Sequence, residues 1–168
     1  AALQADEEWS SGNYAKPPEK GLRAFGRVYV AWAYSHAFFR DAMYRELGFA
    51  TLEDFVRDWE EDHLKWDAND LLAKIWTWQR ADISDNQLYR GDFKRALQSI
   101  RARAIVMPCS SDMYFVPEDN AAEVAAMSRP ELRVFESPWG HCAGSPGRVP
   151  EFQRALDLAA AELLRGST

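Results

Sequence analysis

Two residues of the sequence, Asp112 and His141, could together carry out acid–base chemistry. Asp112 follows the β-branched run ARAIVMP, and His141 follows the apolar run LRVFES. In open parallel α/β sheets, reactive groups gather beyond the carboxyl ends of the strands. One strand–helix–strand unit separates the two residues, so the chain returns to a neighbouring position on the same edge. We expect the carboxylate to accept a hydrogen bond from one imidazole nitrogen, which leaves the other nitrogen free to deprotonate a nucleophile.

Each of these residues also has an ordinary structural interpretation. Asp112 could cap a nearby helix or close a turn, and His141 could be a solvated loop residue. Their order along the chain, with a β-α-β unit between them, favours the catalytic interpretation. Three aromatic residues close to the pair are candidate substrate contacts, although simple packing also explains them: Tyr114, Phe115 and Trp139.

The elements that would position this pair follow from the hydrophobic period. Apolar spacings of three and four predict one long helix from Gly21 to Leu47, ended by Gly48, and a second that Thr51 caps. Further helices are predicted over 67–84, 92–100, 117–128 and 150–164, with strands at 102–108 and 132–137. Two parallel strands do not make a stable sheet, because both faces and both edges must be covered. We therefore expect the sheet to be incomplete in this chain.

Composition excludes several function classes. A net charge of −6 without a basic block argues against nucleic acid and anionic membranes as partners. No apolar run approaches the ~20 residues of a membrane span, and the first residues lack the regions of a signal peptide, so we expect a cytoplasmic protein. Cys109 and Cys142 make no disulfide framework. We expect His36 to be packed and His63 to be solvated, and no metal site, because their spacing is not that of a metal motif.

Three segments carry a specific resemblance: WDANDLLAKIWTWQRADIS, YRGDFKRALQSIRARAIVMPCSSDMYFVPEDNAAEVAAM and ESPWGHCAG. They resemble the C-terminal half of homoserine O-acetyltransferase-like proteins, a family of the α/β-hydrolase superfamily, and the resemblance covers most of the chain from about Trp9 onward. It implies the α/β class, as an incomplete α/β-hydrolase fold in which a helical lid precedes a β-α-β-α terminal unit.

The same resemblance implies a division of the chain into domains. Residues 1–20 would be a loop or linker, 21–100 the helical lid, and 101–168 the C-terminal part of the sheet domain. The seventh and eighth strands of the family would then be Ala104–Met107 and Arg133–Phe135.

By this resemblance Asp112 is the acid and His141 the base of a catalytic triad. The nucleophile elbow G-x-S-x-G does not occur in the sequence; AGSPG at 143–147 is its nearest imitation, and Ser110 and Ser111 are interpreted as turn residues. We therefore expect the nucleophilic serine to lie in an N-terminal half outside this chain. Without that partner the chain alone is expected to be inactive.

With its N-terminal half, the resemblance implies an acyltransferase that moves an acyl group from acyl-CoA, as co-substrate, to a small alcohol through a serine acyl-enzyme. It implies no bound cofactor, and it is compatible with a homodimer formed through the lid helices. The base is commonly followed by Asp in the family but by Cys142 here, so another alcohol or water remains open as the acceptor. The alternatives are a serine esterase or related hydrolase, and a non-catalytic helical module that binds a partner.

Overall fold

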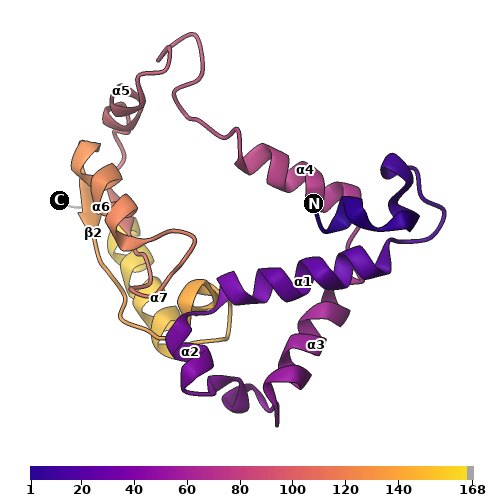
Figure 1. Cartoon of the computed structure of the whole chain (residues 1–168). Coiled ribbons are helices and arrows are strands. Elements are labelled where there is room, and N and C mark those ends of the chain that lie inside the picture. The colour runs from indigo at the N-terminus through magenta and orange to yellow at the C-terminus, as the bar shows by residue number, and fades with distance from the viewer. Residues whose placement is uncertain (166–168) are drawn as a thin grey trace. The chain divides into compact units, whose positions relative to one another are not determined.

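The computed structural model describes residues 1–165, which form two compact units (Figure 1). The first unit consists of Ala1–Trp32 and Phe39–Ala81, and the second of Ala33–Phe38 together with the described residues from Asp82 onward. Residues 166–168 of the predicted C-terminal domain lie outside the described residues. The division into linker, lid and sheet domain stays a prediction.

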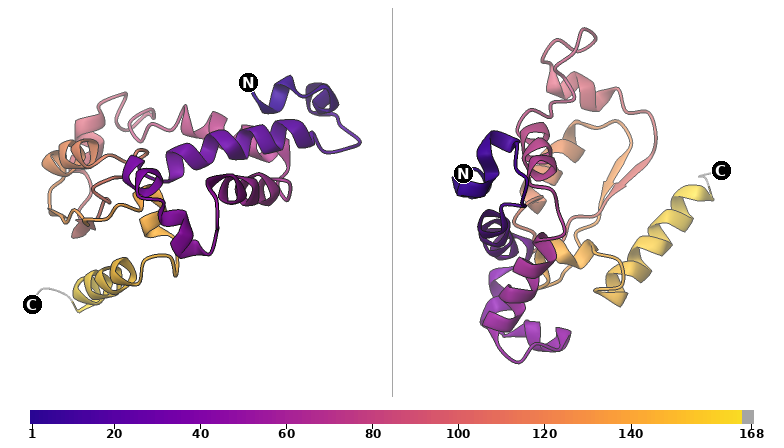
Figure 2. Two further views of the ribbon diagram at one scale, coloured as in Figure 1. Left: turned by 60° about the horizontal axis from the view of Figure 1, so that its bottom comes forward. Right: turned by 90° about the vertical axis from the view of Figure 1, so that its right-hand side faces the viewer.

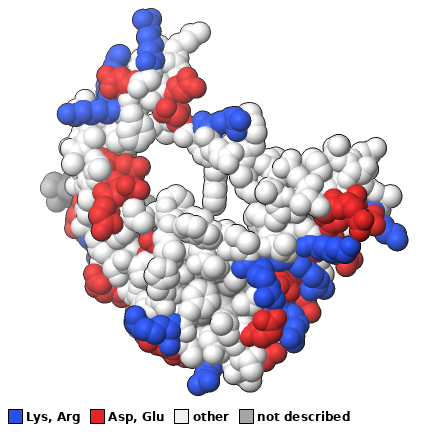
Figure 3. Space-filling model, in the orientation of Figure 1, with Lys and Arg blue, Asp and Glu red and all other residues white. Residues whose placement is uncertain are grey.

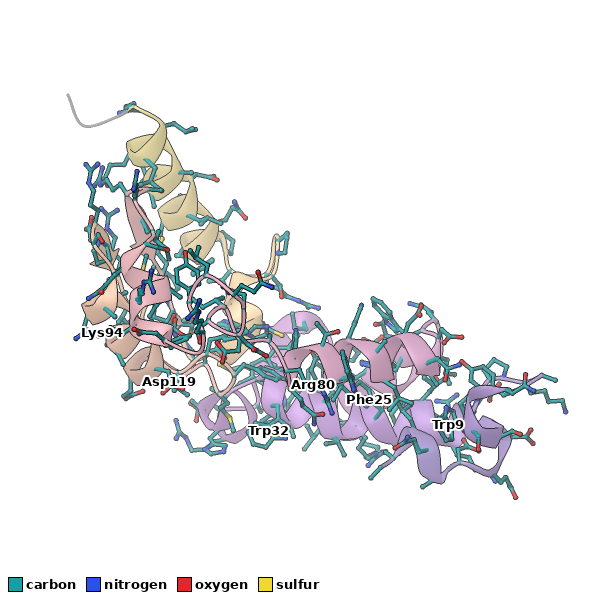
Figure 4. All side chains as sticks on the ribbon, turned by 90° about the horizontal axis from the view of Figure 1, so that it is seen from above. Trp9, Phe25, Trp32, Arg80, Lys94 and Asp119 are labelled. Carbon is teal, nitrogen blue, oxygen red and sulfur yellow. The ribbon has the colours of Figure 1, made fainter. Side chains whose placement is uncertain are left out.

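Helices dominate the first half of the chain. In chain order they are the 3-10 helices η1 (Leu3–Ala5) and η2 (Glu7–Gly12), α1 (Glu19–Ala33), α2 (His36–Arg40), η3 (Met43–Leu47), α3 (Leu52–His63) and α4 (Ala68–Trp78). The N-terminal helices fold back beside α1 (Figure 2). Together with α4 they form a small core of Leu3, Leu22, Ala68 and Leu71, against which Trp9 and Phe25, labelled in Figure 4, pack.

The prediction of a single long helix from Gly21 to Leu47 is wrong, since α1 ends at Ala33 and α2 and η3 follow it. The hydroxyl of Ser35 accepts a hydrogen bond from the backbone N–H of Phe38 at 3.0 Å and so caps a new helix, α2. Ala42 then adopts a φ of +53°, which a right-handed helix does not contain. Apolar spacing continues through both breaks, and for this reason the pattern alone did not reveal them.

Caps explain most of the remaining helix boundaries. The hydroxyl of Thr51 accepts from the N–H of Asp54 at 3.1 Å, which confirms the predicted start of α3. Gly48 has a φ of +90° and ends η3, also as predicted. The predicted helix 67–84 ends earlier, at Trp78, because Asp82 accepts from both the N–H and the hydroxyl of Ser84 and closes a competing turn.

Both histidines of the helical region differ from the prediction. His63 is buried, with Nδ1 2.7 Å from the carbonyl oxygen of Trp59 and its ring against Phe25 and Tyr29. It fits there because Gly26 leaves room: a Cβ on Gly26 would lie 2.9 Å from His63 Nδ1. His36 is exposed, since the break before α2 moves it off the expected apolar stripe.

The sheet of the second unit has two described strands. β1 (Ala104–Val106) pairs in parallel with β2 (Pro130–Leu132), and the strand predicted at Ala104–Met107 is confirmed to within one residue. The second strand was predicted three residues too late, at Arg133–Phe135. Phe135 instead forms an isolated bridge with Cys109, because Pro108 has no N–H and interrupts the ladder.

Three helices accompany this sheet: α5 (Phe93–Gln98), α6 (Pro117–Ala126) and α7 (Pro150–Leu164). A proline occupies the first turn of both α6 and α7, where its missing N–H costs nothing, and the predicted range of α7 is confirmed. α6 contacts β2 and α7 contacts β1 (Figure 1). This β-α-β-α arrangement, in a chain that is otherwise helical, is consistent with part of an α/β domain.

Ion pairs bind α7 to the strands. Glu162 of α7 pairs with Arg103, and its second oxygen lies 2.6 Å from Arg133, which also pairs with Glu131 of β2. Elsewhere acidic and basic side chains are interspersed over the face shown in Figure 3. Within the described range, no helix combines the length and apolar character needed to cross a membrane.

Candidate active site

The two residues singled out in the sequence are hydrogen bonded in the structure. Oδ2 of Asp112 lies 3.0 Å from Nδ1 of His141. An ionised carboxylate can only accept a hydrogen bond, so this contact favours the tautomer with the proton on Nδ1 and Nε2 as the acceptor. The Asp112 side chain is 8% exposed and the His141 side chain 34%, so the base can be reached from outside while the acid is shielded.

The acid is held by the turn that follows β1. The N–H of Asp112 donates to the carbonyl oxygen of Cys109 at 3.1 Å. The second carboxylate oxygen, Oδ1, accepts from the N–H groups of Tyr114 at 2.7 Å and Phe115 at 3.2 Å. The side chain therefore closes its own turn as well as contacting the histidine. It does not cap α6, whose N-cap residue is Val116.

The base is held by the segment after β2. His141 is the second residue of a 3-10 helix, η4 (Gly140–Gly144). Gly140 has a φ of +63°, and a Cβ at this position would lie 2.7 Å from the backbone nitrogen of Ser35. The hydroxyl of Ser35 donates to the carbonyl oxygen of Pro138 in the same segment. A glycine is needed here for both its conformation and its lack of a side chain.

Two of the three predicted aromatic neighbours contact the base. The ring centroid of Tyr114 is 4.8 Å and that of Phe115 is 5.5 Å from the imidazole of His141. Trp139 instead packs in the interior against Tyr34 and Phe38, at centroid distances of 6.3 and 5.4 Å. The role of all three in substrate contact stays a prediction.

A cavity of about 250 Å³ opens beside the pair. Its walls are mainly apolar, and among its described lining residues Asp112 is the one carboxylate and none is Lys or Arg. The larger side chains around it are Met107, Phe115, Asn120, His141 and Phe152. Such a space suits a small, uncharged molecule next to the imidazole.

Three residues near the pair were predicted only as turn or helix residues. Ser110 and Ser111 hydrogen bond to the segment that carries His141, and Ser35 reaches the same segment from far earlier in the chain. The place of Ser110 and Ser111 beside Asp112 was an available signal, whereas nothing in the local pattern points to Ser35. No cluster of three or more His, Cys, Asp or Glu side chains suited to a metal occurs among the described residues.

Comparison of the sequence with known proteins finds several relatives. No protein-family model matches the sequence. A probable esterase of Corynebacterium glutamicum is 34% identical over 160 residues, which are 92% of this chain and 45% of that protein. Ethyl acetate hydrolase of Pseudomonas veronii is 31% identical over 166 residues, which are 97% of this chain and 47% of that protein. A homoserine O-acetyltransferase of Trichormus variabilis is 27% identical over 150 residues, 84% of this chain and 40% of that protein.

Solved structures that resemble this chain are also named as esterases. The acetyl esterase MekB matches with a TM-score of 0.90 and 31% identity, over 98% of this chain and 48% of that chain. An acetylester hydrolase from Corynebacterium glutamicum matches with a TM-score of 0.87 and 31% identity, over 98% of this chain and 47% of that chain. The chain spans about half the length of the curated relatives it matches.

The resemblance found in the sequence is thereby confirmed. The homologues of this chain are enzymes, namely esterases and homoserine O-acetyltransferases of the α/β-hydrolase superfamily, and the partial matches fit a C-terminal portion of such an enzyme.

Proposed function

We propose that this chain supplies the acid and the base of a serine esterase that hydrolyses short, uncharged esters. The observation that carries the proposal is the 3.0 Å contact between Asp112 Oδ2 and His141 Nδ1, beyond the carboxyl ends of two parallel strands. This contact fixes the tautomer in which Nε2 accepts a proton, and the carboxylate stabilises the imidazolium that then forms.

The nucleophile is proposed to be a serine outside these 168 residues. Two observations support this: the sequence contains no G-x-S-x-G, and the chain spans about half of its curated relatives. Nε2 of His141 would take the proton of that serine as its oxygen attacks the carbonyl carbon of the ester. The departing alkoxide would take this proton from Nε2 and leave an acyl-serine. A water molecule, deprotonated by Nε2, would then attack the acyl carbon. As the bond from that carbon to the serine oxygen breaks, the serine would take the proton back from Nε2 and the acid would leave.

The lining of the cavity supports a small, neutral substrate. Apart from Asp112, whose oxygens are already engaged by a turn and by His141, no charged carboxylate or cation lines it among the described residues. Relatives named as an ethyl acetate hydrolase and an acetyl esterase also act on small esters by their names. We therefore favour acetyl esters of short alcohols as the substrate class.

The second candidate is the acyltransferase implied by the sequence, with acyl-CoA as donor and an alcohol as acceptor. Its support is the homoserine O-acetyltransferase relative at 27% identity. The residue after the base favours the esterase, because Cys142 is buried and offers no carboxylate for the ammonium group of an amino-acid acceptor.

The test uses the complete protein that contains this chain. It is incubated with ethyl acetate, and separately with acetyl-CoA and homoserine, and both free acetate and acetylated acceptor are quantified. We expect acetate from the ester and no acetylhomoserine, and His141→Gln should abolish the release. His36→Gln, at an exposed histidine outside the pair, is the matched control and should keep the full rate. Wild-type rates in the His141 variant would refute the proposal.

A further inference from the structure

One side chain connects the turn of the acid to the segment of the base. The hydroxyl of Ser111 donates to the carbonyl oxygen of Ser137 at 2.5 Å and accepts from the N–H of Gly140 at 3.1 Å. Ser111 precedes Asp112 directly, and Gly140 precedes His141 directly. The two halves of the candidate pair are thus joined a second time, through the residue before each of them.

The contacts made by Ser111 hold both ends of a four-residue segment, 137–140. The two residues that precede Ser111 contact only the first end of this segment, and more weakly. Ser110 accepts from the N–H of Ser137 at 3.3 Å, and the thiol of Cys109 lies 3.4 Å from the carbonyl oxygen of Ser137. Among these three residues, only Ser111 also binds the end next to His141. Removal of its hydroxyl would leave the N–H of Gly140 without this acceptor.

We propose that Ser111 is a positioning residue, whose hydroxyl sets the distance between Asp112 and His141 without touching the substrate. This inference rests on the proposed function of the pair. The Ser111 hydroxyl donates its proton to the carbonyl oxygen of Ser137. Ser111 therefore holds the segment of the base in place and is not the proposed nucleophile. Loss of this hydroxyl lets residues 137–140 and the adjoining His141 shift. Small displacements of a catalytic group lower the rate strongly, because its geometry must match the reacting atoms.

The kinetic test compares three serine variants of the complete protein with the preferred acetyl ester. Ser111→Ala should lower kcat roughly 10- to 100-fold, with KM changed by no more than about twofold, because substrate binding is not involved. Ser111→Thr retains the hydroxyl and should restore most of the rate. Ser128→Ala is the matched control: it removes an exposed hydroxyl that donates to Gln98, and should have no effect.

A spectroscopic test is independent of any substrate. With histidine labelled by nitrogen-15, the Nδ1–H proton of His141 should give a downfield resonance, identified by its absence in His141→Gln. We expect the resonance in wild type and in Ser111→Thr, and its loss or a clear upfield shift in Ser111→Ala. If the wild-type protein hydrolyses no ester, the proposed function fails, while this resonance still decides whether Ser111 positions the pair.

The outcomes separate positioning from general stability. Should Ser111→Ala not fold, Ser111→Cys replaces the hydroxyl by a weaker donor of similar shape and should give an intermediate kcat and a weakened resonance. A folded Ser111→Ala or Ser111→Cys protein with the wild-type kcat and the wild-type resonance would overturn the inference.

Discussion

The carboxylate of Asp112 and the imidazole of His141 are hydrogen bonded although the two residues are 29 positions apart in the chain. The parallel pairing of β1 with β2 brings the ends of both strands to one edge, and Asp112 lies six residues beyond β1 while His141 lies nine residues beyond β2. The same carboxylate accepts two backbone N–H groups of its own turn. The turn after β1 therefore contributes directly to the position of the base.

The first prediction concerns the tautomer of the base. In Asp112→Asn the amide oxygen can still accept from Tyr114 and Phe115, so the turn should persist. Its NH₂ group, however, would face Nδ1 of His141 and favour the tautomer with the proton on Nε2. We expect kcat of the complete protein on its ester to fall roughly 10³- to 10⁴-fold with KM little changed, as measured by steady-state kinetics.

The matched control for this prediction is Asp82→Asn. Asp82 also closes a turn, by accepting from the N–H and hydroxyl of Ser84, but it has no histidine partner in the structure described. Its replacement should leave kcat unchanged. An Asp112→Asn protein as active as the Asp82 variant would show that the carboxylate is not required.

The sequence predicted most elements because their ends depend on local chemistry. Thr51 caps α3 through its own side chain, and Pro150 starts α7. The break at Ser35 was missed, because the apolar period runs through it and the constraint comes from tertiary contacts with Pro138 and Gly140. The register of β2 was missed for a related reason, since pairing partners decide where a ladder forms.

The topology made the candidate pair predictable from the sequence. The contacts that hold the pair in place could not be predicted in this way. A β-α-β unit returns the chain to the same edge, so Asp112 and His141 were expected to meet. The hydroxyl contacts of Ser35 and Ser111 depend on the exact path of residues 137–140, which no spacing rule encodes. Trp139 was within two residues of the base, yet its indole packs against Phe38 in the interior.

The second prediction concerns the acid stability of the first unit. The buried carboxylate of Asp6 accepts from the N–H of Gly21 at 2.8 Å and of Glu8 at 3.1 Å, and the Gly21 bond is the main reason why its pKa lies below the ordinary 3.8. A lowered pKa stabilises the fold above the unfolded-state pKa, and this contribution is lost as pH falls through the folded-state value. Asp6→Asn should therefore unfold more easily at neutral pH, with the difference shrinking below about pH 4.

Denaturant titrations at several pH values measure this difference. Asp41→Asn serves as the control, because the pKa of Asp41 is also lowered, chiefly by its bond to Arg40, but the pair is exposed. Exposed pairs contribute little to stability, so this variant should resemble wild type at every pH. A gap between wild type and Asp6→Asn that stays constant down to the lowest pH would contradict the assignment to the carboxylate.

The third prediction concerns alkaline pH and Cys142. Burial raises the pKa of the Cys142 thiol above its ordinary 9.0. A raised pKa gives stability that is complete below the unfolded-state value and is lost as pH rises through the folded-state value. Above about pH 8.5, close to the ordinary pKa of a cysteine thiol, wild type should thus lose stability faster than Cys142→Ala. Parallel curves for the two proteins would mean that the thiol ionises equally easily in the folded and unfolded states.

The fourth prediction separates crowding from backbone conformation at two glycines of the second unit. Gly140 and Gly147 both have positive φ, +63° and +74°, so alanine is strained at either site. A Cβ at Gly140 would meet the backbone of Ser35 at 2.7 Å, whereas nothing lies within 4 Å of one at Gly147. Gly147→Ala should cost about 1–2 kcal/mol from conformation alone, and Gly140→Ala about 1–3 kcal/mol more from overpacking.

Denaturant unfolding of the complete protein measures both costs, and kinetics supply a second readout. Because Gly140 precedes His141, relief of the clash must displace the base, so Gly140→Ala should also lower kcat while Gly147→Ala leaves it unchanged. Equal losses of stability in the two variants would show that the backbone of Ser35 moves away freely. In that case the contact between residues 33–38 and the base segment would not be what holds His141 in place.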